Sequence, residues 1–122
     1  MSLLHRILAP LTRLFTGEAH EKLLRSEEER ARIEAQCARL ALYEFRTCPY
    51  CVKVRRAINR LDLPIERRDI RVEGRFRDEL IARGGKGQVP CLRIEEESGE
   101  VRWLYESFDI IRYLEERFDR AD

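Results

Sequence analysis

The sequence has no apolar run long enough to cross a bilayer, because charged residues interrupt every hydrophobic stretch. It also lacks the layout of a secretory signal peptide: Arg6 and Arg13 interrupt the first apolar residues, and no small-residue cleavage site follows. Nor is there an excess of one charge, since 24 basic and 23 acidic side chains leave a formal net charge of +1. These absences predict a cytoplasmic protein with no nucleic-acid partner.

Metal-ligating residues are scarce as well. The two histidines, His5 and His20, lie near the N-terminus, and two of the four cysteines, Cys37 and Cys91, stand alone. A zinc site built on the remaining C-x2-C pair needs a second closely spaced pair, which the sequence does not contain. Four cysteines in this arrangement do not form a disulfide framework either. We therefore predict a reducing compartment and no metal site.

The motif Cys48-Pro49-Tyr50-Cys51 carries the clearest chemistry. It follows an apolar run at residues 40–45, which is typical of a strand, and it opens a helical pattern over 49–60. A helix N-terminus carries partial positive charge and favours the thiolate form of a cysteine placed there. The thiolate attacks sulfur, and the second cysteine lies one turn away, within reach of a disulfide. The pair predicts a thiol–disulfide oxidoreductase.

Strand and helix patterns alternate through the rest of the chain. We expect, in order, a strand at 65–70, a helix at 73–83, a break at the glycine-rich residues 84–87, two strands at 91–95 and 101–105 joined as a hairpin, and a last helix at 107–118. Preceded by the strand and helix around the cysteine pair, this order predicts the α/β class with one mixed sheet.

The first forty residues predict a helical extension, residues 1–39, ahead of a domain at 40–119. Residues 3–15 place leucines, isoleucine and phenylalanine on one helical face, with Pro10 as a kink. That face suits a membrane interface, its own domain or a second copy of the chain, and the pattern does not choose. Ser26 and Glu29 form a capping box that begins a polar helix at 27–38. Within it, Cys37 is expected to be a half-buried small residue.

Three segments together resemble the glutaredoxin family of the thioredoxin-like superfamily. Residues 48–51 resemble its dithiol active site, and Gln88-Val89-Pro90 resembles its Thr-Val-Pro segment, whose proline is cis. Residues 105–110 resemble the turn that opens the last helix, and the pair Glu106-Ser107 is closer to glutathione-transferase N-terminal domains. The resemblance covers residues 40–119 and implies a thioredoxin-like fold with a four-stranded mixed sheet flanked by helices.

The resemblance also implies a cofactor and a set of site residues. Glutathione would reduce protein–glutathione mixed disulfides and protein disulfides through Cys48, with Cys51 as the resolving thiol. The glutathione-binding residues implied by the resemblance are Tyr50, Val89, Pro90, Glu106 and Ser107, with either Arg46 or Lys86 for the glycine carboxylate. Cys91 is expected to be a buried strand residue, with a third thiol facing Cys48 as the alternative.

Three other functions remain open from the sequence. Two copies could share an iron–sulfur cluster through Cys48 and two glutathiones, although Pro49 disfavours this by resemblance. A flavoprotein reductase could supply the electrons in place of glutathione. A glutathione transferase ranks last, because the sequence ends at Asp122 without the helical second domain that would form an electrophile pocket.

Overall fold

The computed structural model describes residues 25–118. The chain divides into two compact units, Met1–Ala31 and Arg32–Asp122, and the second contains both cysteines of the motif. The predicted amphipathic helix at 3–15 lies outside the described residues. The predicted division into an extension at 1–39 and a domain at 40–119 stays a prediction.

Helix α2 (Glu27–Cys37) begins with the predicted capping box. The Ser26 backbone N–H donates to Glu29 Oε1 at 3.2 Å, and the Glu29 N–H donates to Ser26 Oγ at 3.1 Å. The helix ends one residue earlier than predicted. Its last residue, Cys37, is 1% exposed and belongs to the apolar core, so it is more deeply buried than the sequence suggested.

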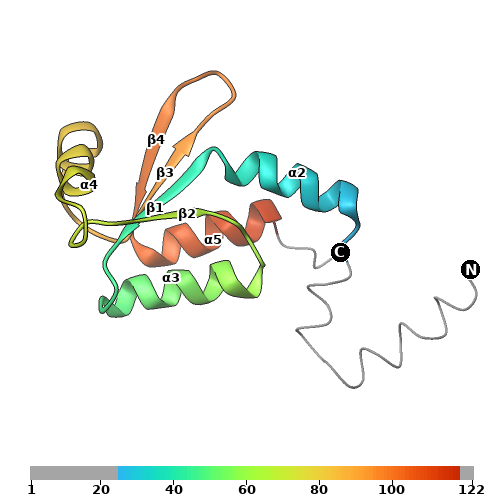
Figure 1. Cartoon of the computed structure of the whole chain (residues 1–122), viewed down its shortest axis with the longest axis horizontal. Helices are drawn as coiled ribbons and strands as arrows, with labels where there is room; N and C mark the ends of the chain where they lie inside the picture. The colour runs from blue at the N-terminus through green and yellow to red at the C-terminus, as the bar shows by residue number, and fades with distance from the viewer. Residues whose placement is uncertain (1–24, 119–122) are drawn as a thin grey trace, which may run out of the picture. The chain divides into compact units, whose positions relative to one another are not determined.

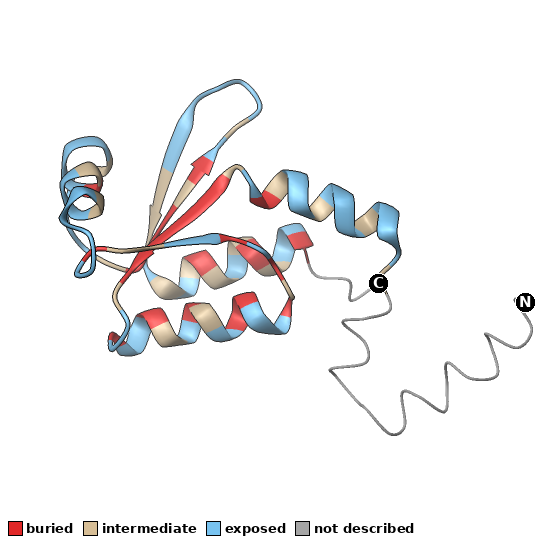
Figure 2. Cartoon of the chain, in the orientation of Figure 1, coloured by how far each residue is buried: buried red, intermediate tan, exposed pale blue. Residues whose placement is uncertain are grey.

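A four-stranded mixed sheet forms the middle layer of the second unit (Figure 1). Its strand order is β2-β1-β3-β4, with β1 and β2 parallel and the other neighbours antiparallel. The strands are β1 (Leu40–Glu44), β2 (Glu66–Asp69), β3 (Cys91–Glu95) and β4 (Val101–Tyr105). All four lie within two residues of the predicted ranges, and β1 is buried along its whole length (Figure 2).

Helices α3 (Pro49–Arg60) and α5 (Ser107–Phe118) lie side by side on one face of the sheet (Figure 1). Their apolar sides meet alternate residues of the strands, as period-two alternation requires. The core on this face includes Leu42, Val54, Ile58, Leu92, Ile110 and Leu114. Both helices have the predicted bounds, and the thioredoxin-like fold is confirmed.

The other face of the sheet carries the chain between β2 and β3. Helix α4 (Gly74–Glu79) runs directly into a π-helical turn, η1 (Leu80–Gly84), and Gly85 ends the segment with a left-handed φ of 99°. The sequence predicted one regular helix at 73–83, since hydrophobic spacing does not distinguish a π-helical turn from a final α-helical one. Within the described range, no helix has both the length and the apolar character needed to span a membrane.

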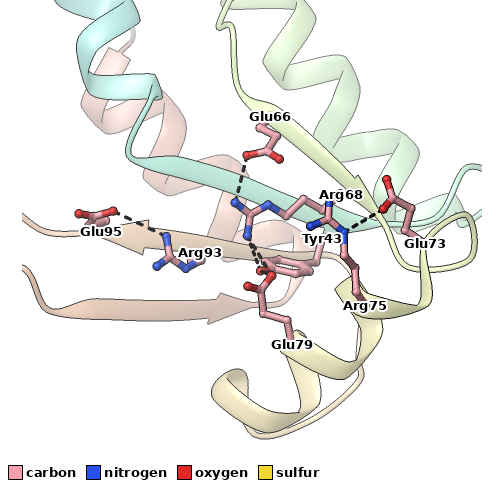
Figure 3. A network of polar contacts seen from close by, with 8 residues as sticks. All are labelled: Tyr43, Glu66, Arg68, Glu73, Arg75, Glu79, Arg93 and Glu95. Atoms are coloured by element: carbon pink, nitrogen blue, oxygen red, sulfur yellow. Dashed lines mark hydrogen bonds and ion pairs between the residues drawn. The ribbon is translucent and has the colours of Figure 1, made fainter.

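Aromatic and charged side chains mix on this second face (Figure 3). Tyr43 donates a hydrogen bond to Glu79, and Arg68 Nη1 bonds both the Tyr43 hydroxyl at 2.7 Å and Glu79 Oε1 at 3.0 Å. The Arg68 guanidinium lies 5.4 Å from the centre of the Tyr43 ring. Trp103 packs on the same tyrosine, with ring centres 5.5 Å apart. The network ties α4 to the sheet through polar contacts.

Candidate functional site

Cys48 lies at the N-cap of α3, where the sequence placed it. Its φ of −71° and ψ of 122° are extended, and Pro49 occupies the first turn, where a missing N–H costs nothing. The Cys48 side chain makes no capping hydrogen bond, so its sulfur is not tied to the helix backbone. Cys48 is 6% exposed and is a free thiol, as are Cys37, Cys51 and Cys91.

Cys51 lies one turn further along α3 and is fully buried. Burial raises the pKa of the Cys51 thiol to about 12, and its hydrogen bond with the Cys48 side chain and the negative charge of Glu44 act in the same direction. A backbone hydrogen bond at Phe45 opposes them. The structure therefore brings the two predicted sulfurs together, with Cys48 the more exposed and Cys51 held as a protonated thiol at neutral pH.

Glu44 is a buried carboxylate next to the motif that sequence reasoning did not single out. It is 4% exposed and pairs with Arg55 of α3 and with Arg67 Nε at 3.5 Å. Arg55 Nη2 also donates to the carbonyl oxygen of Arg46 at 2.8 Å, which ties α3 to the turn before Cys48. The signal was present in the sequence: a carboxylate interrupts the apolar strand 40–45.

The segment before β3 has the predicted proline geometry. The Val89–Pro90 peptide bond is cis, Pro90 is buried, and Val89 is half-buried against the aromatic cluster of the second face. Cys91, directly after the proline, is fully buried on that face beside Tyr43. Burial raises the pKa of the Cys91 thiol to about 12, which favours the buried structural thiol over a third reactive one.

Tyr105 is the second residue that sequence reasoning left out of the site. Its hydroxyl donates to the carbonyl oxygen of Lys86 at 2.9 Å, and Tyr105 is the cross-strand partner of Cys91. The Lys86 ammonium lies 4.7 Å from the centre of the Tyr105 ring. A tyrosine at the end of a strand is normally interpreted as a packing residue. The sequence alone therefore does not reveal the hydrogen bond of Tyr105 with the loop.

Glu106 and Ser107 form the turn into α5. Glu106 has a left-handed φ of 75°, which an amino acid with a side chain adopts only where the surroundings impose it. Its carbonyl oxygen accepts the Ile110 N–H at 3.0 Å, so the helix proper begins at Ser107. Glu106 is exposed and Ser107 is half-buried. The first N–H groups of α5 have no acceptor within the helix.

The remaining predicted residues, Arg46 and Tyr50, both lie on the surface. Tyr50 is 59% exposed, with the Lys53 ammonium 5.7 Å from its ring centre. Arg46 is exposed, and its carbonyl oxygen carries the contact with α3 described above. Among residues 25–118, no cluster of three or more histidine, cysteine or acidic side chains could hold a metal ion.

A surface pocket of about 660 Å³ lies away from this site. It is lined by Arg39, Arg117 and acidic residues of the hairpin between β3 and β4. No cysteine and none of the predicted glutathione-binding residues lines it.

Comparison with known proteins identifies the family. A family profile described as "Glutathione S-transferase, N-terminal domain" matches residues 42–121, which is more than half of the chain. A search of curated proteins finds no match. The glutaredoxin assignment made from the motifs is thus supported only at the level of the shared superfamily.

Solved structures give the same result. A maleylacetoacetate isomerase from Anaeromyxobacter dehalogenans 2CP-1, with glutathione bound in its active site, is 30% identical over 67% of this chain, with a TM-score of 0.52. Glutathione transferase E6 from Drosophila melanogaster is 25% identical over 68%, with a TM-score of 0.54. A Pseudomonas fluorescens pf-5 family member with two glutathiones bound is 21% identical over 69%, with a TM-score of 0.55, and shows the fold alone.

The match is to one part of these proteins. The chain spans 38%, 36% and 38% of their lengths, respectively. The four-stranded sheet and its flanking helices lie almost wholly within the matched residues 42–121. The chain belongs to the glutathione S-transferase N-terminal domain family of the thioredoxin-like superfamily.

Proposed function

We propose that this protein is a glutathione-dependent thiol–disulfide oxidoreductase that acts through Cys48. The observation that carries the proposal is the position of Cys48 at the start of α3, with Cys51 one turn away on the same helix. Helix termini favour thiolates, and a neighbouring thiol can resolve a mixed disulfide. Glutathione as the co-substrate is supported by the family and by the glutathione bound to the isomerase neighbour.

Three parts of the chain would bind glutathione. The backbone at Val89, which precedes the cis Pro90, would offer hydrogen bonds to the cysteinyl part. The N-terminus of α5 at Ser107 offers N–H groups to the γ-glutamyl carboxylate, and the exposed Glu106 carboxylate suits the γ-glutamyl ammonium. Tyr50 forms an exposed apolar wall beside Cys48.

The proposed reaction is two disulfide exchanges. In the first, the Cys48 thiolate attacks the glutathione sulfur of a protein–glutathione mixed disulfide; a new S–S bond forms, and the protein thiol leaves with the electron pair. In the second, the thiolate of a free glutathione attacks the glutathione sulfur on Cys48, forming glutathione disulfide and returning the Cys48 thiolate. The protein substrate is reduced, and glutathione is oxidised.

Cys51 would serve a second route. With a protein disulfide as substrate, Cys51 attacks the mixed disulfide at Cys48, closing a Cys48–Cys51 bond that glutathione later reduces. Because the pKa of Cys51 is raised to about 12, a small fraction of this thiol is ionised at neutral pH. We therefore propose glutathionylated proteins as the main partners and disulfide-containing proteins as the lesser ones.

The location and the N-terminal part complete the proposal. We place the reaction in the cytoplasm, where reduced glutathione keeps thiols free. Residues 1–39 would act as an extension ahead of a redox domain at 40–119. Its segment 3–15 would contact a membrane surface or a second copy of the chain.

Glutathione transfer or isomerisation is a second candidate. It is favoured by the family match and by the isomerase neighbour, one structure of which carries dicarboxyethyl glutathione. The paired thiols at the start of α3 favour exchange over transfer. Conjugation of glutathione to an aromatic chloride electrophile, faster than without protein and unaffected by Cys48→Ser, would support transfer instead.

The deciding experiment is turnover of a small glutathione mixed disulfide, with glutathione, glutathione reductase and NADPH consumption as the readout. We expect Cys48→Ser to abolish turnover and Cys51→Ser to retain it. Cys37→Ser is the matched control, because Cys37 is equally buried but lies outside the site. Wild-type protein that shows reduced Cys48 and no turnover would refute the proposal.

A further inference from the structure

Tyr105 links two parts of the proposed glutathione site: the loop before Val89 and the turn into α5. Its hydroxyl donates to the Lys86 carbonyl oxygen at 2.9 Å, in the loop that leads to Val89. On the chain, Tyr105 directly precedes the Glu106 turn. Tyr105 thus connects the loop before Val89 to the end of β4, and its cross-strand partner is Cys91, the residue after the cis proline.

The hydroxyl fits a space that only glycine leaves open. A Cβ on Gly84 would lie 2.6 Å from the Tyr105 hydroxyl oxygen and 3.0 Å from the Trp103 ring. Contacts this short do not occur between unstrained atoms, so an alanine at this position would displace the tyrosine. Gly84 is the last residue of the π-helical turn η1, so the end of this turn leaves the space that the Tyr105 hydroxyl occupies.

The side chain of Lys86 is held by the same residue. Its ammonium lies 4.7 Å from the centre of the Tyr105 ring, and its backbone carbonyl is bonded to the hydroxyl. The ammonium and the backbone carbonyl of Lys86 therefore both contact Tyr105. Within residues 25–118, Arg46, the other candidate for the glycine carboxylate of glutathione, is anchored only at its carbonyl oxygen, by Arg55. An anchored cation loses less conformational freedom on binding a ligand than a free one.

We propose that Tyr105 is a positioning residue for glutathione: its hydroxyl fixes the loop 84–88 so that Lys86 presents its ammonium to the glycine carboxylate. This inference rests on the proposed function, since it assigns a residue to the same glutathione site. Tyr105 does not touch the reacting sulfurs in this assignment. It acts through Lys86 and the backbone that follows it.

Calorimetric titration of glutathione into the full chain tests the inference directly. The titration is made in a Cys48→Ser background, which prevents covalent adducts. Adding Tyr105→Phe removes the hydroxyl and keeps the ring, and we expect the Kd for glutathione to rise about five-fold, the change that one neutral hydrogen bond produces. Tyr113→Phe is the matched control, because its hydroxyl contacts Arg117 of α5 and no residue of the loop, and its Kd should equal that of the background.

Turnover measurements separate positioning from a general structural role. In protein with Cys48 intact, Tyr105→Phe should raise the KM for glutathione and change kcat by less than about two-fold. Gly84→Ala should raise the Kd in the same way as Tyr105→Phe, and the two changes together should be less than additive because they act on one contact. Gly84→Ala that fails to fold leaves the Tyr105→Phe titration as the decisive measurement.

The outcomes distinguish this inference from the proposed function. Glutathione binding that weakens in Tyr105→Phe, in a protein without disulfide turnover, would support the positioning role and refute the oxidoreductase. Turnover with an unchanged Kd and KM in Tyr105→Phe would overturn the positioning role and leave the oxidoreductase intact. Absence of glutathione binding in the Cys48→Ser background would overturn the positioning role as well.

Discussion

The two faces of the sheet are built in different ways. The face covered by α3 and α5 is a continuous apolar core, and residues such as Leu42 and Leu92 are fully buried in it. The face covered by α4 and η1 has a smaller apolar cluster, held to the helix by the network of Tyr43, Arg68 and Glu79 (Figure 3). Leu42 and Tyr43, which are neighbours in β1, therefore differ in role: Leu42 packs in the apolar core, and Tyr43 takes part in the polar network.

The difference shows how stability and binding are divided. Apolar burial is strong and non-directional, so the α3/α5 face provides the stability that fixes the start of α3. Polar contacts are directional and have less net effect, so the α4 face fixes geometry in the loop before the cis proline. We expect changes on the first face to lower stability, and equivalent changes on the second to have smaller effects on stability.

The largest expected effect is that of Leu42→Ala. Leu42 lies in β1 opposite Leu92 of β3 and is fully buried in the core of the first face. Removing its side chain loses apolar burial and leaves a cavity, which lowers the free energy of unfolding by about 3 kcal/mol. Urea unfolding followed by circular dichroism measures it. A loss below about 1 kcal/mol would contradict the central place given to this face.

Glu44→Gln tests the one buried acidic side chain next to the motif. The change leaves Arg55 without its buried partner, and we expect the free energy of unfolding to fall by about 2 kcal/mol. It should also loosen the turn at Arg46, since Arg55 holds that carbonyl. Hydrogen exchange of the Cys48 amide, compared with wild type, measures the second effect; unchanged exchange would mean that Arg55 does not fix the turn.

Tyr43→Phe probes the second face at the position beside Leu42. It removes a hydroxyl that bonds Glu79 and Arg68 while leaving those two paired. We expect a loss of about 1 kcal/mol in the free energy of unfolding, the usual net value of one hydrogen bond. A loss as large as that of Leu42→Ala would mean that both faces contribute equally to stability.

The last expected effect concerns how the free energy of unfolding falls at alkaline pH. Burial raises the pKa values of Cys51 and Cys91 to about 12, above the 9.0 of an exposed thiol. The folded state then holds protons that the unfolded state releases, so their contribution is complete below about pH 9 and is lost as the pH rises towards 12. Cys91→Ala should flatten the fall in unfolding free energy above about pH 9, as should Cys51→Ala.

Opposite results would be informative for each thiol. Because the two cysteines lie on different faces, the two flattening effects should add. An alkaline limb identical to wild type in either variant would show that the thiol concerned ionises equally in both states.

The sequence predicted the helices and strands well because the periodic hydrophobic segments of this chain are bounded by glycine, proline and other turn residues. The motif at 48–51, the cis proline and the turn at 106–107 were all predicted, and the structure places each at the expected element end. Glu44 and Tyr105 were missed, because a buried ion pair and a strand-to-loop hydrogen bond depend on residues distant in the chain. The π-helical turn was missed because it keeps the spacing of an ordinary helix.

The pairing of β3 with β4 also makes the hairpin at their ends a practical site for engineering. Cys91 pairs with Tyr105 at the end of the ladder nearest the site, whereas Glu95 pairs with Val101 at the opposite end. Residues 97–100 of the connection between them are exposed. A fluorescent reporter or affinity tag inserted there would extend an exposed tip and leave the register unchanged. The hairpin tip thus offers an attachment point for a reporter of the proposed glutathione binding, at the end of the ladder opposite Tyr105.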